Sequence, residues 1–385
     1  MAATVDIALQ NQTTSNTVYA YITGQAIDNN NALFLLQADG KTAYNPTSPS
    51  APGAALAQDC AIPLGAPGNT VTVTVPHLAG SRIWFSVDDK LTFLLNPGPA
   101  LVEPSVTNPS DPNINTTWDF CEFTFNSSQL FVNITYVDFV SLPIALTLTN
   151  TSGGTQHVTG TSPNGLDAIC AGLSAQDNTD HAGWSSLIVP KPSGGNLRAL
   201  SPNNGIVLNN NLFKDYYQIY VDKVWSAYSD QDLKIDTQAQ WGTVTGRVAS
   251  NALTFPDVGS FAQPSSGDIF SCSTGPFAAS GTNTAEMGAL TARISAAFNR
   301  STLLNDSDVE PSGNPGGYYQ EGITNHYSRI VHAANADGKG YAFPYDDVSP
   351  SGGEDQSGAV HDPSPQLLTV AVGGGGVGSG MVVQQ

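Results

Sequence analysis

The stretch WDFCEFTFNSSQLFVNITYV, residues 118–137, has the pattern of a β-hairpin. Its phenylalanines alternate with Glu122, Thr124 and Asn126, and a strand places alternate side chains on opposite faces of a sheet. One face is therefore expected to be apolar and to form a core, and the other to be polar. The Ser-Ser-Gln run that follows predicts a turn, and residues 130–137 then return as a second strand.

Short segments of the same kind fill the rest of residues 1–155, separated by clusters of Pro, Gly, Asn and Asp. Many short strands with frequent turns favour a β-sandwich or barrel. The segments that predict strands are 5–9, 18–22, 32–36, 71–75, 82–86, 91–95 and 144–149.

The pattern changes after residue 155. Apolar residues at helical spacing predict helices at 165–175, 212–228, 284–298, with Asn283 or Thr284 as a cap, and 323–334, and a strand-like piece lies at 241–248. Segments 341–345 and 367–372 are β-like again. We therefore expect a mainly β protein with an α/β part: residues 1–155 with 336–385 form one domain, and 156–335 form an inserted mixed domain. A wide groove between two such domains is the natural place for a ligand.

The composition limits the partners. Only 12% of the 385 residues are charged, about half the usual share, so that uncharged polar residues must cover the surface. The net charge of −19 disfavours nucleic acid and anionic membranes, which need a basic counter-surface. It does not disfavour a neutral polysaccharide. We expect a secreted protein, acting as a monomer, with no cofactor and no metal site.

Four cysteines, with no Cys-x-x-Cys pair, give no support to a zinc site and fit two disulfides, although free buried thiols are the alternative. Seven Asn-x-Ser/Thr sequons also favour a secreted glycoprotein. They lie at Asn11, Asn115, Asn126, Asn133, Asn150, Asn299 and Asn305.

Glu122 and Asp138 are the candidate chemical pair. If the turn centres near Ser128, Thr135 lies opposite Glu122, and Asp138 follows about three residues later, on the order of 10 Å along the strand. A bulge would shorten that distance. Two carboxyl groups about 6.5–9.5 Å apart leave room for a water molecule between acid and sugar. Periodicity alone favours the alternative, two ordinary surface carboxylates.

Several blocks, in this order, resemble glycoside hydrolase family 64, the laminaripentaose-producing β-1,3-glucanases. They are residues 75–86 (VPHLAGSRIWFS), 91–98 (LTFLLNPG), 99–106 (PALVEPSV), 118–126 (WDFCEFTFN), 137–143 (VDFVSLP), 298–300 (FNR), 325–327 (NHY) and 341–347 (YAFPYDD). The resemblance covers most of the chain.

This resemblance implies a thaumatin-like β domain beside a mixed α/β domain, with a wide groove between them. It implies hydrolysis of β-1,3-glucan with inversion, in which Glu122 is the general acid and Asp138 the general base, and release of short products such as laminaripentaose. It also suggests that Thr124, Asn126 and Thr135 line the sugar site.

Other side chains are weaker candidates for contact with the sugar. Trp118, Trp184 and Tyr345 are aromatic rings that could stack on sugars, although core packing is the alternative for each. Asp346 and Asp347 are adjacent and would point to opposite faces of a strand, which disfavours a joint acid–base pair. At least one is expected to line the groove, with Asp347 as the candidate, and a turn or salt-bridge role is the alternative. The alternative function is a non-catalytic β-glucan-binding defence protein on a thaumatin-like scaffold.

Overall fold

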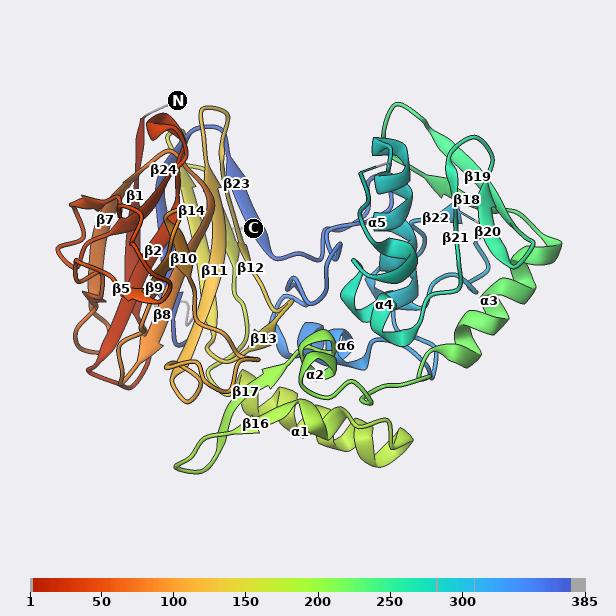
Figure 1. The fold of residues 1–385 in the computed structure, drawn as a ribbon, viewed down its shortest axis with the longest axis horizontal. Helices are drawn as coiled ribbons and strands as arrows, with labels where there is room; N and C mark the ends of the chain where they lie inside the picture. Colours follow the sequence, from red (N-terminus) through yellow and green to blue (C-terminus); the bar gives the residue numbers. More distant parts are fainter. Residues whose placement is uncertain (1–2, 282, 308, 375–385) are drawn as a thin grey trace.

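The computed structural model describes residues 3–281, 283–307 and 309–374 (Figure 1). Most of the strands gather in one part of the molecule, and most of the helices lie in the other. The C-terminal segment returns from the helical part to the β part, where its last strand lies beside the first. The division into domains at residues 155 and 336 stays a prediction.

Two sheets form the β part. The larger sheet runs in the order β23 (Ala359–Asp362), β12 (Leu130–Ile134), β11 (Thr117–Phe125), β8 (Leu78–Val87), β2 (Val18–Ala26), β3 (Ala32–Leu36) and β4 (Ala43–Tyr44), with β6 (Ile62–Pro63) paired to β2. The other sheet runs in the order β15 (Thr155–Val158), β14 (Ile144–Asn150), β24 (Pro365–Val372), β1 (Thr4–Asn11) and β7 (Thr70–Pro76). A small sheet of β10 (Ala100–Val102), β9 (Leu94–Asn96) and β5 (Ala54–Ala55) accompanies them.

The helical part contains two further sheets. One consists of β13 (Phe139–Val140), β17 (Asn196–Leu200) and β16 (Ile188–Pro190), and the other of β21 (Gly259–Phe261), β20 (Ala252–Phe255), β19 (Thr243–Ala249), β18 (Leu233–Asp236) and β22 (Val309–Glu310). The helices are α1 (Gly165–Asp180), α2 (Pro202–Leu208), α3 (Gln218–Asp230), α4 (Ser266–Ser271), α5 (Ala285–Arg300) and α6 (His326–Ala334). None of the helices in the described residues is long and apolar enough to cross a membrane.

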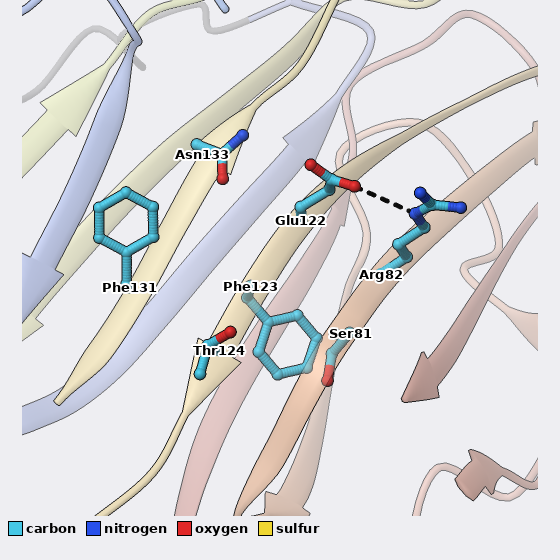
Figure 2. A pocket seen from close by; sticks show the side chains of 8 residues that line it. Ser81, Arg82, Glu122, Phe123, Thr124, Phe131 and Asn133 are labelled. Carbon is cyan, nitrogen blue, oxygen red and sulfur yellow. Dashed lines mark hydrogen bonds and ion pairs between the residues drawn. The ribbon is translucent and has the colours of Figure 1, made fainter. Parts of the chain in front are cut away.

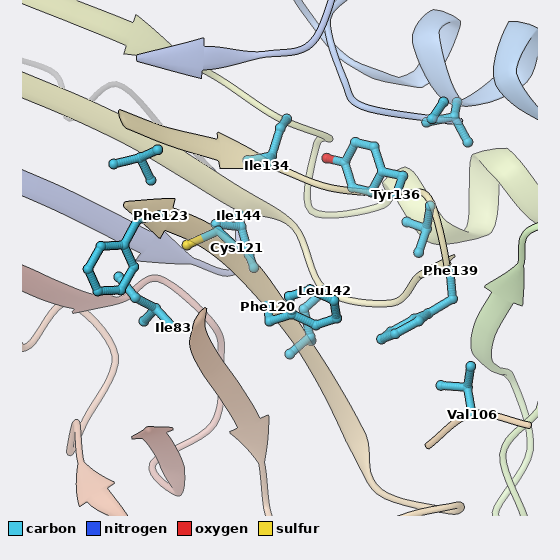
Figure 3. Packing of buried hydrophobic residues seen from close by; sticks show 14 of the residues in the cluster. Ile83, Val106, Phe120, Cys121, Phe123, Ile134, Tyr136, Phe139, Leu142 and Ile144 are labelled. Atoms are coloured by element: carbon cyan, nitrogen blue, oxygen red, sulfur yellow. The ribbon is translucent and has the colours of Figure 1, made fainter. Parts of the chain in front are cut away.

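Alternation along β11 determines which side chains enter the core. Cys121, Phe123 and Phe125 are at most 2% exposed, whereas Glu122 and Thr124 between them are only partly buried. Figure 3 shows Cys121 among the apolar side chains beneath the sheet. The polar face predicted for residues 122–126 is therefore confirmed for this part of the strand.

The expectation of disulfides is wrong. All four cysteines are free and buried, each packed as a small apolar side chain in a different place: Cys60 just before β6, Cys121 in β11, Cys170 in α1 and Cys272 at the end of α4.

Two local expectations also differ from the structure. The helix predicted at 212–228 begins only at Gln218, because Phe213 and Asp215 have φ values of 56° and 59°, which interrupt a right-handed helix. Residues 341–345 form no strand beyond one bridge from Tyr341 to Thr135, because Pro344 lacks an N–H and Tyr345 has φ 70°. The Thr284 cap of α5 is confirmed, since its side chain accepts a hydrogen bond from the N–H of Met287.

Candidate active site

The hairpin of β11 and β12 carries the centre of the site. Its turn is one residue earlier than expected, since Phe125 pairs with Leu130 and the N–H of Asn126 bonds to the carbonyl of Gln129 at 3.0 Å. Asn133, and not Thr135, therefore lies opposite Glu122. A shift of two positions in the partner strand leaves the exposed face unchanged, so Asn133 replaces Thr135 at the site.

A cavity of about 310 Å³ lies over this hairpin (Figure 2). Glu122 and Thr124 of β11 face Asn133 and Phe131 of β12, so that these four side chains form adjacent pairs on one face. Phe131 is 36% exposed, an unusual exposure for a large aromatic ring. The complete lining consists of Gly80, Ser81, Arg82, Glu122, Phe123, Thr124, Phe131 and Asn133.

A second cavity, of about 200 Å³, shares Glu122, Phe131 and Asn133 with the first and continues toward the return segment from the helical part. There Tyr341 and Asp347 line it, together with Ser357. The Tyr341 hydroxyl donates to Asp347 Oδ1 at 3.1 Å. Glu122 therefore lies where the two cavities meet, with side chains distant in sequence on both sides.

Asp138 is held in a bend after β12. Its carbonyl accepts hydrogen bonds from the N–H of Ser201 and from the side chain of Asn204, both at 2.9 Å. The buried carboxylate of Asp119 accepts from the N–H groups of Ser141 and Leu142 at 2.8 and 3.0 Å, which anchors the chain just after Asp138 to β11. Asp138 therefore lies in a bend and not in a straight strand, and it is not among the residues that line the two cavities.

One arginine joins the carboxylates of the site. Arg82 is the direct β8 partner of Glu122, and its Nε donates to Glu122 Oε1 at 3.1 Å, as Figure 2 shows. Its Nη1 donates to Glu103 Oε2. The guanidinium lies 4.7 Å from the ring centroid of Phe120, which fixes its plane.

The charges of this cluster act on each other. Burial raises the pKa of Asp138, whereas the Arg82 charge and a hydrogen bond from Asn204 lower it by less. Burial also raises the pKa of Glu103, Arg82 lowers it, and the charges of Glu122 and Asp138 raise it again. Glu122, Asp138, Glu103 and Arg82 thus form one electrostatic group, although they are separated by up to 56 positions in the sequence.

Of the four other polar residues predicted for the site, two line the cavities and two do not. Thr124 and Asp347 line the cavities. Asn126 caps the hairpin turn through its side-chain oxygen, which accepts from the N–H groups of Ser128 and Gln129. Thr135 is buried and forms a bridge to Tyr341.

Two of the three aromatic candidates lie inside the protein, and the third is only partly buried. Trp118 is 1% exposed and packs against Trp84, Phe120 and Phe139, so it does not present its ring to a sugar. Trp184 is fully buried, and Tyr345 packs at the edge of a cluster in the helical part. Alternation along β11 places Trp118 on the same face as Glu122. Trp118 is nevertheless buried, because the chain that follows β12, including Phe139, covers this end of the strand.

Sequence reasoning missed Phe131, Asn133, Arg82, Glu103 and Tyr341. The first two had a detectable signal, because alternation along residues 130–137 with the correct turn places both on the Glu122 face. Arg82 and Glu103 had none beyond their presence in the blocks of resemblance. Within the described ranges no group of three or more His, Cys, Asp or Glu side chains is placed to hold a metal ion.

Comparison with known proteins shows the family of the chain. Residues 3–372 match the family described as β-1,3-glucanase, glycoside hydrolase family 64. The chain belongs to this family. It is 32% identical over 308 residues to the glucan endo-1,3-beta-glucosidases of Cellulosimicrobium cellulans and of Arthrobacter sp. strain YCWD3, an alignment that covers 78% of this chain. The chain spans about half the length of these curated relatives, since the alignment covers 53% of each.

Solved structures of the glycoside hydrolase 64 family share the fold. A laminaripentaose-producing β-1,3-glucanase in complex with laminaritetraose superposes with a TM-score of 0.86 at 31% identity, covering 96% of this chain and 99% of that one. A β-1,3-glucanase domain of this family from Clostridium beijerinckii gives a TM-score of 0.72 at 20% identity, covering 97% and 98%, which bears on the fold alone.

Proposed function

We propose that this glycoside hydrolase 64 chain cleaves β-1,3-glucan with inversion, and that Glu122 is the acid and Asp138 the base. The observation that carries the proposal is the place of Glu122 at the junction of the two cavities, in one charged cluster with Asp138. Family membership and the similarity to a glucanase bound to laminaritetraose support the choice of substrate.

The reaction needs two carboxyl groups in opposite protonation states. Glu122 gives its proton to the glycosidic oxygen as the bond from that oxygen to the anomeric carbon breaks. Asp138 takes a proton from the water molecule whose oxygen bonds to the same carbon from the opposite face. After the products leave, Asp138 releases its proton and Glu122 takes one up from solvent. The exposed ring of Phe131 and the amide of Asn133 are placed to hold the sugar beside Glu122.

The stereochemical outcome can be measured directly. Laminarin added to the enzyme in an NMR tube should first give the α-anomer at the new reducing ends, because inversion of a β-linkage produces the α configuration. Chromatography of the same mixture gives the product lengths, for which we propose laminaripentaose. An initial β-anomer would overturn inversion alone. Tight binding to insoluble glucan without any released sugar would instead favour the non-catalytic binding protein.

The pH dependence should report the environment of Asp138. A general base must be ionised, so kcat/KM should fall as the pH drops through the pKa of Asp138, which burial places above the usual aspartate value. Replacing Asn204 by alanine removes a hydrogen bond that favours the ionised form, and should move this acid limb to higher pH by up to about one unit. The measurement is a pH profile of laminarin hydrolysis. Asn203→Ala on the same helix is the matched control, and an unmoved limb in Asn204→Ala would contradict the role of Asp138.

We also propose that the protein is secreted, which its low charge content and seven sequons support. The glucanase activity of a producing culture would then be found in the medium, and activity confined to washed cells would count against it.

A further inference from the structure

Arg82 holds two carboxylates on two different nitrogens. Its Nε faces Glu122 and its Nη1 faces Glu103, and the side chains of both ion pairs are about one-third exposed. Stacking on Phe120 and a distance of 5.4 Å to the Trp84 ring leave the guanidinium little freedom to turn. Glu103 follows β10 directly and precedes the buried Pro104, so its own backbone is fixed as well.

The position of Arg82 alone conflicts with the proposed chemistry. A guanidinium within hydrogen-bond distance of a carboxyl group favours the ionised form of that group, whereas a general acid must carry a proton. A second carboxylate bonded to the same guanidinium reduces this preference for the ionised form, because its negative charge offsets the positive charge of the guanidinium. Glu103 supplies that carboxylate.

Glu103 is not among the residues that line either of the two cavities described above, although Arg82 and Glu122 are. Its contact with the site runs through Nη1 of Arg82. Glu103 is linked to Glu122 through this contact with Arg82 and through its charge.

We propose that Glu103 is a positioning residue of the hydrolysis: it holds Arg82 by the nitrogen remote from Glu122 and offsets its charge, so that Glu122 can carry the proton it donates. This inference rests on the proposed role of Glu122 as acid. The ionisable groups that face the Glu122 carboxylate or line its cavities are Arg82 from β8, Glu103 after β10, Asp138 after β12, and Tyr341 and Asp347 of the return segment.

Replacing Glu103 by glutamine tests the inference, because glutamine keeps the size and a hydrogen-bond acceptor for Arg82 but removes the charge. We expect the alkaline limb of the kcat profile on laminarin to move to lower pH, because the positive charge of Arg82 beside the acid is then no longer offset. We expect KM to stay within about twofold of the wild-type value, because Glu103 lies outside the linings of both cavities. A merely structural role would lower kcat equally at every pH.

Two further variants separate charge from shape. Glu103→Asp keeps the charge and should leave the alkaline limb in place even if the shorter side chain lowers kcat. Arg82→Gln combined with Glu103→Gln removes both charges and should return the limb toward its wild-type pH. Asp232→Asn is the matched control, since it removes a carboxylate, just before the remote strand β18, that is bonded at 2.8 Å to the Nε of Arg247 on β19.

The outcomes distinguish this inference from the proposed function. An unmoved limb in folded Glu103→Gln, in an enzyme whose activity still depends on Glu122, would overturn the role of Glu103 alone. If Glu103→Gln does not fold, Glu103→Asp gives the test. A displacement of its alkaline limb to lower pH would overturn the role of Glu103, because this variant keeps the charge. A wild-type enzyme that releases no sugar from laminarin would overturn both proposals.

Discussion

Glu122→Gln is expected to lower kcat on laminarin by about 10²- to 10⁴-fold, the usual contribution of a positioned general acid. Glutamine matches the size of glutamate and can still accept the hydrogen bond from Arg82 Nε, which lies 3.1 Å away in the wild-type protein. It has no proton to give to the glycosidic oxygen. The initial rate of reducing-sugar release is the measurement, with circular dichroism to show that the variant is folded.

The leaving group separates the acid from the base. In a laminari-oligosaccharide that carries a 2,4-dinitrophenyl group, this leaving group departs without protonation. Glu122→Gln should therefore recover most of its lost rate on that substrate. Asp138→Asn should stay slow on both substrates, because water must still be deprotonated. Recovery by Asp138→Asn, and none by Glu122→Gln, would exchange the two roles.

The chain contains a close control for Glu122→Gln. Asp232 pairs with Arg247 Nε at 2.8 Å, as Glu122 pairs with Arg82 Nε, but it lies just before β18 in the helical part. Asp232→Asn therefore repeats the loss of an arginine-bound carboxylate and should keep the wild-type rate. Full activity of Glu122→Gln on laminarin would exclude this residue as the acid.

The β-hairpin at the site was predictable because its information is local. Alternation along β11 separated Glu122 and Thr124 from the core phenylalanines, and burial follows that pattern. The register was not predictable to the residue. The side chain of Asn126 caps the turn and makes it one residue earlier than its Ser-Ser-Gln sequence suggests, which moved Asn133 into the place expected for Thr135.

The rest of the site depends on contacts between distant segments. Arg82 is 40 positions before Glu122, and Tyr341 reaches the cavity only because the chain returns from α6 and pairs with Thr135. The local periodicity of a sequence does not indicate such contacts between distant segments. The burial of Trp118 also depends on a contact between separate segments, because the chain that follows β12 covers that end of β11.

Asp346→Asn should have the largest effect on stability, for a reason independent of catalysis. Asp346 is fully buried beside the cavity residue Asp347. Its carboxylate accepts from Arg300 Nη2 at 2.9 Å, His332 Nε2 at 2.8 Å and the N–H of Ala342 at 3.0 Å. It thereby ties α5 and α6 to the segment that carries Tyr341 to the cavity.

Asparagine in this place leaves the buried Arg300 charge without its carboxylate. Removing one partner of a buried ion pair costs about 3–5 kcal/mol, so we expect a loss of this size in the free energy of unfolding in urea. The neighbouring Asp347 is exposed, and Asp347→Asn should change stability by no more than about 0.5 kcal/mol. Equal stability of the two variants would show that the buried cluster contributes little.

The pH dependence of stability gives a second test of the same cluster. Burial opposes the charged form of Asp346, but His332 and Arg300 outweigh it and lower the pKa of Asp346, so its contribution is lost as the pH falls through that lowered value. Burial likewise opposes the charged form of His332, but Asp346 outweighs it and raises the pKa of His332, so this contribution is complete below about pH 6.5 and is lost as the pH rises through the raised value. The buried Glu310 also faces Arg300, and burial raises its pKa.

Wild-type stability from this cluster should therefore be greatest between about pH 4 and 6.5, and Asp346→Asn should lose that maximum because it removes the common partner of both ions. Urea unfolding from pH 4 to 9 measures the difference between the two proteins. A difference that stays constant across this range would mean that Asp346 stabilises the return segment through its hydrogen bonds alone, and that the charge on His332 contributes nothing to holding Tyr341 and Asp347 at the cavity.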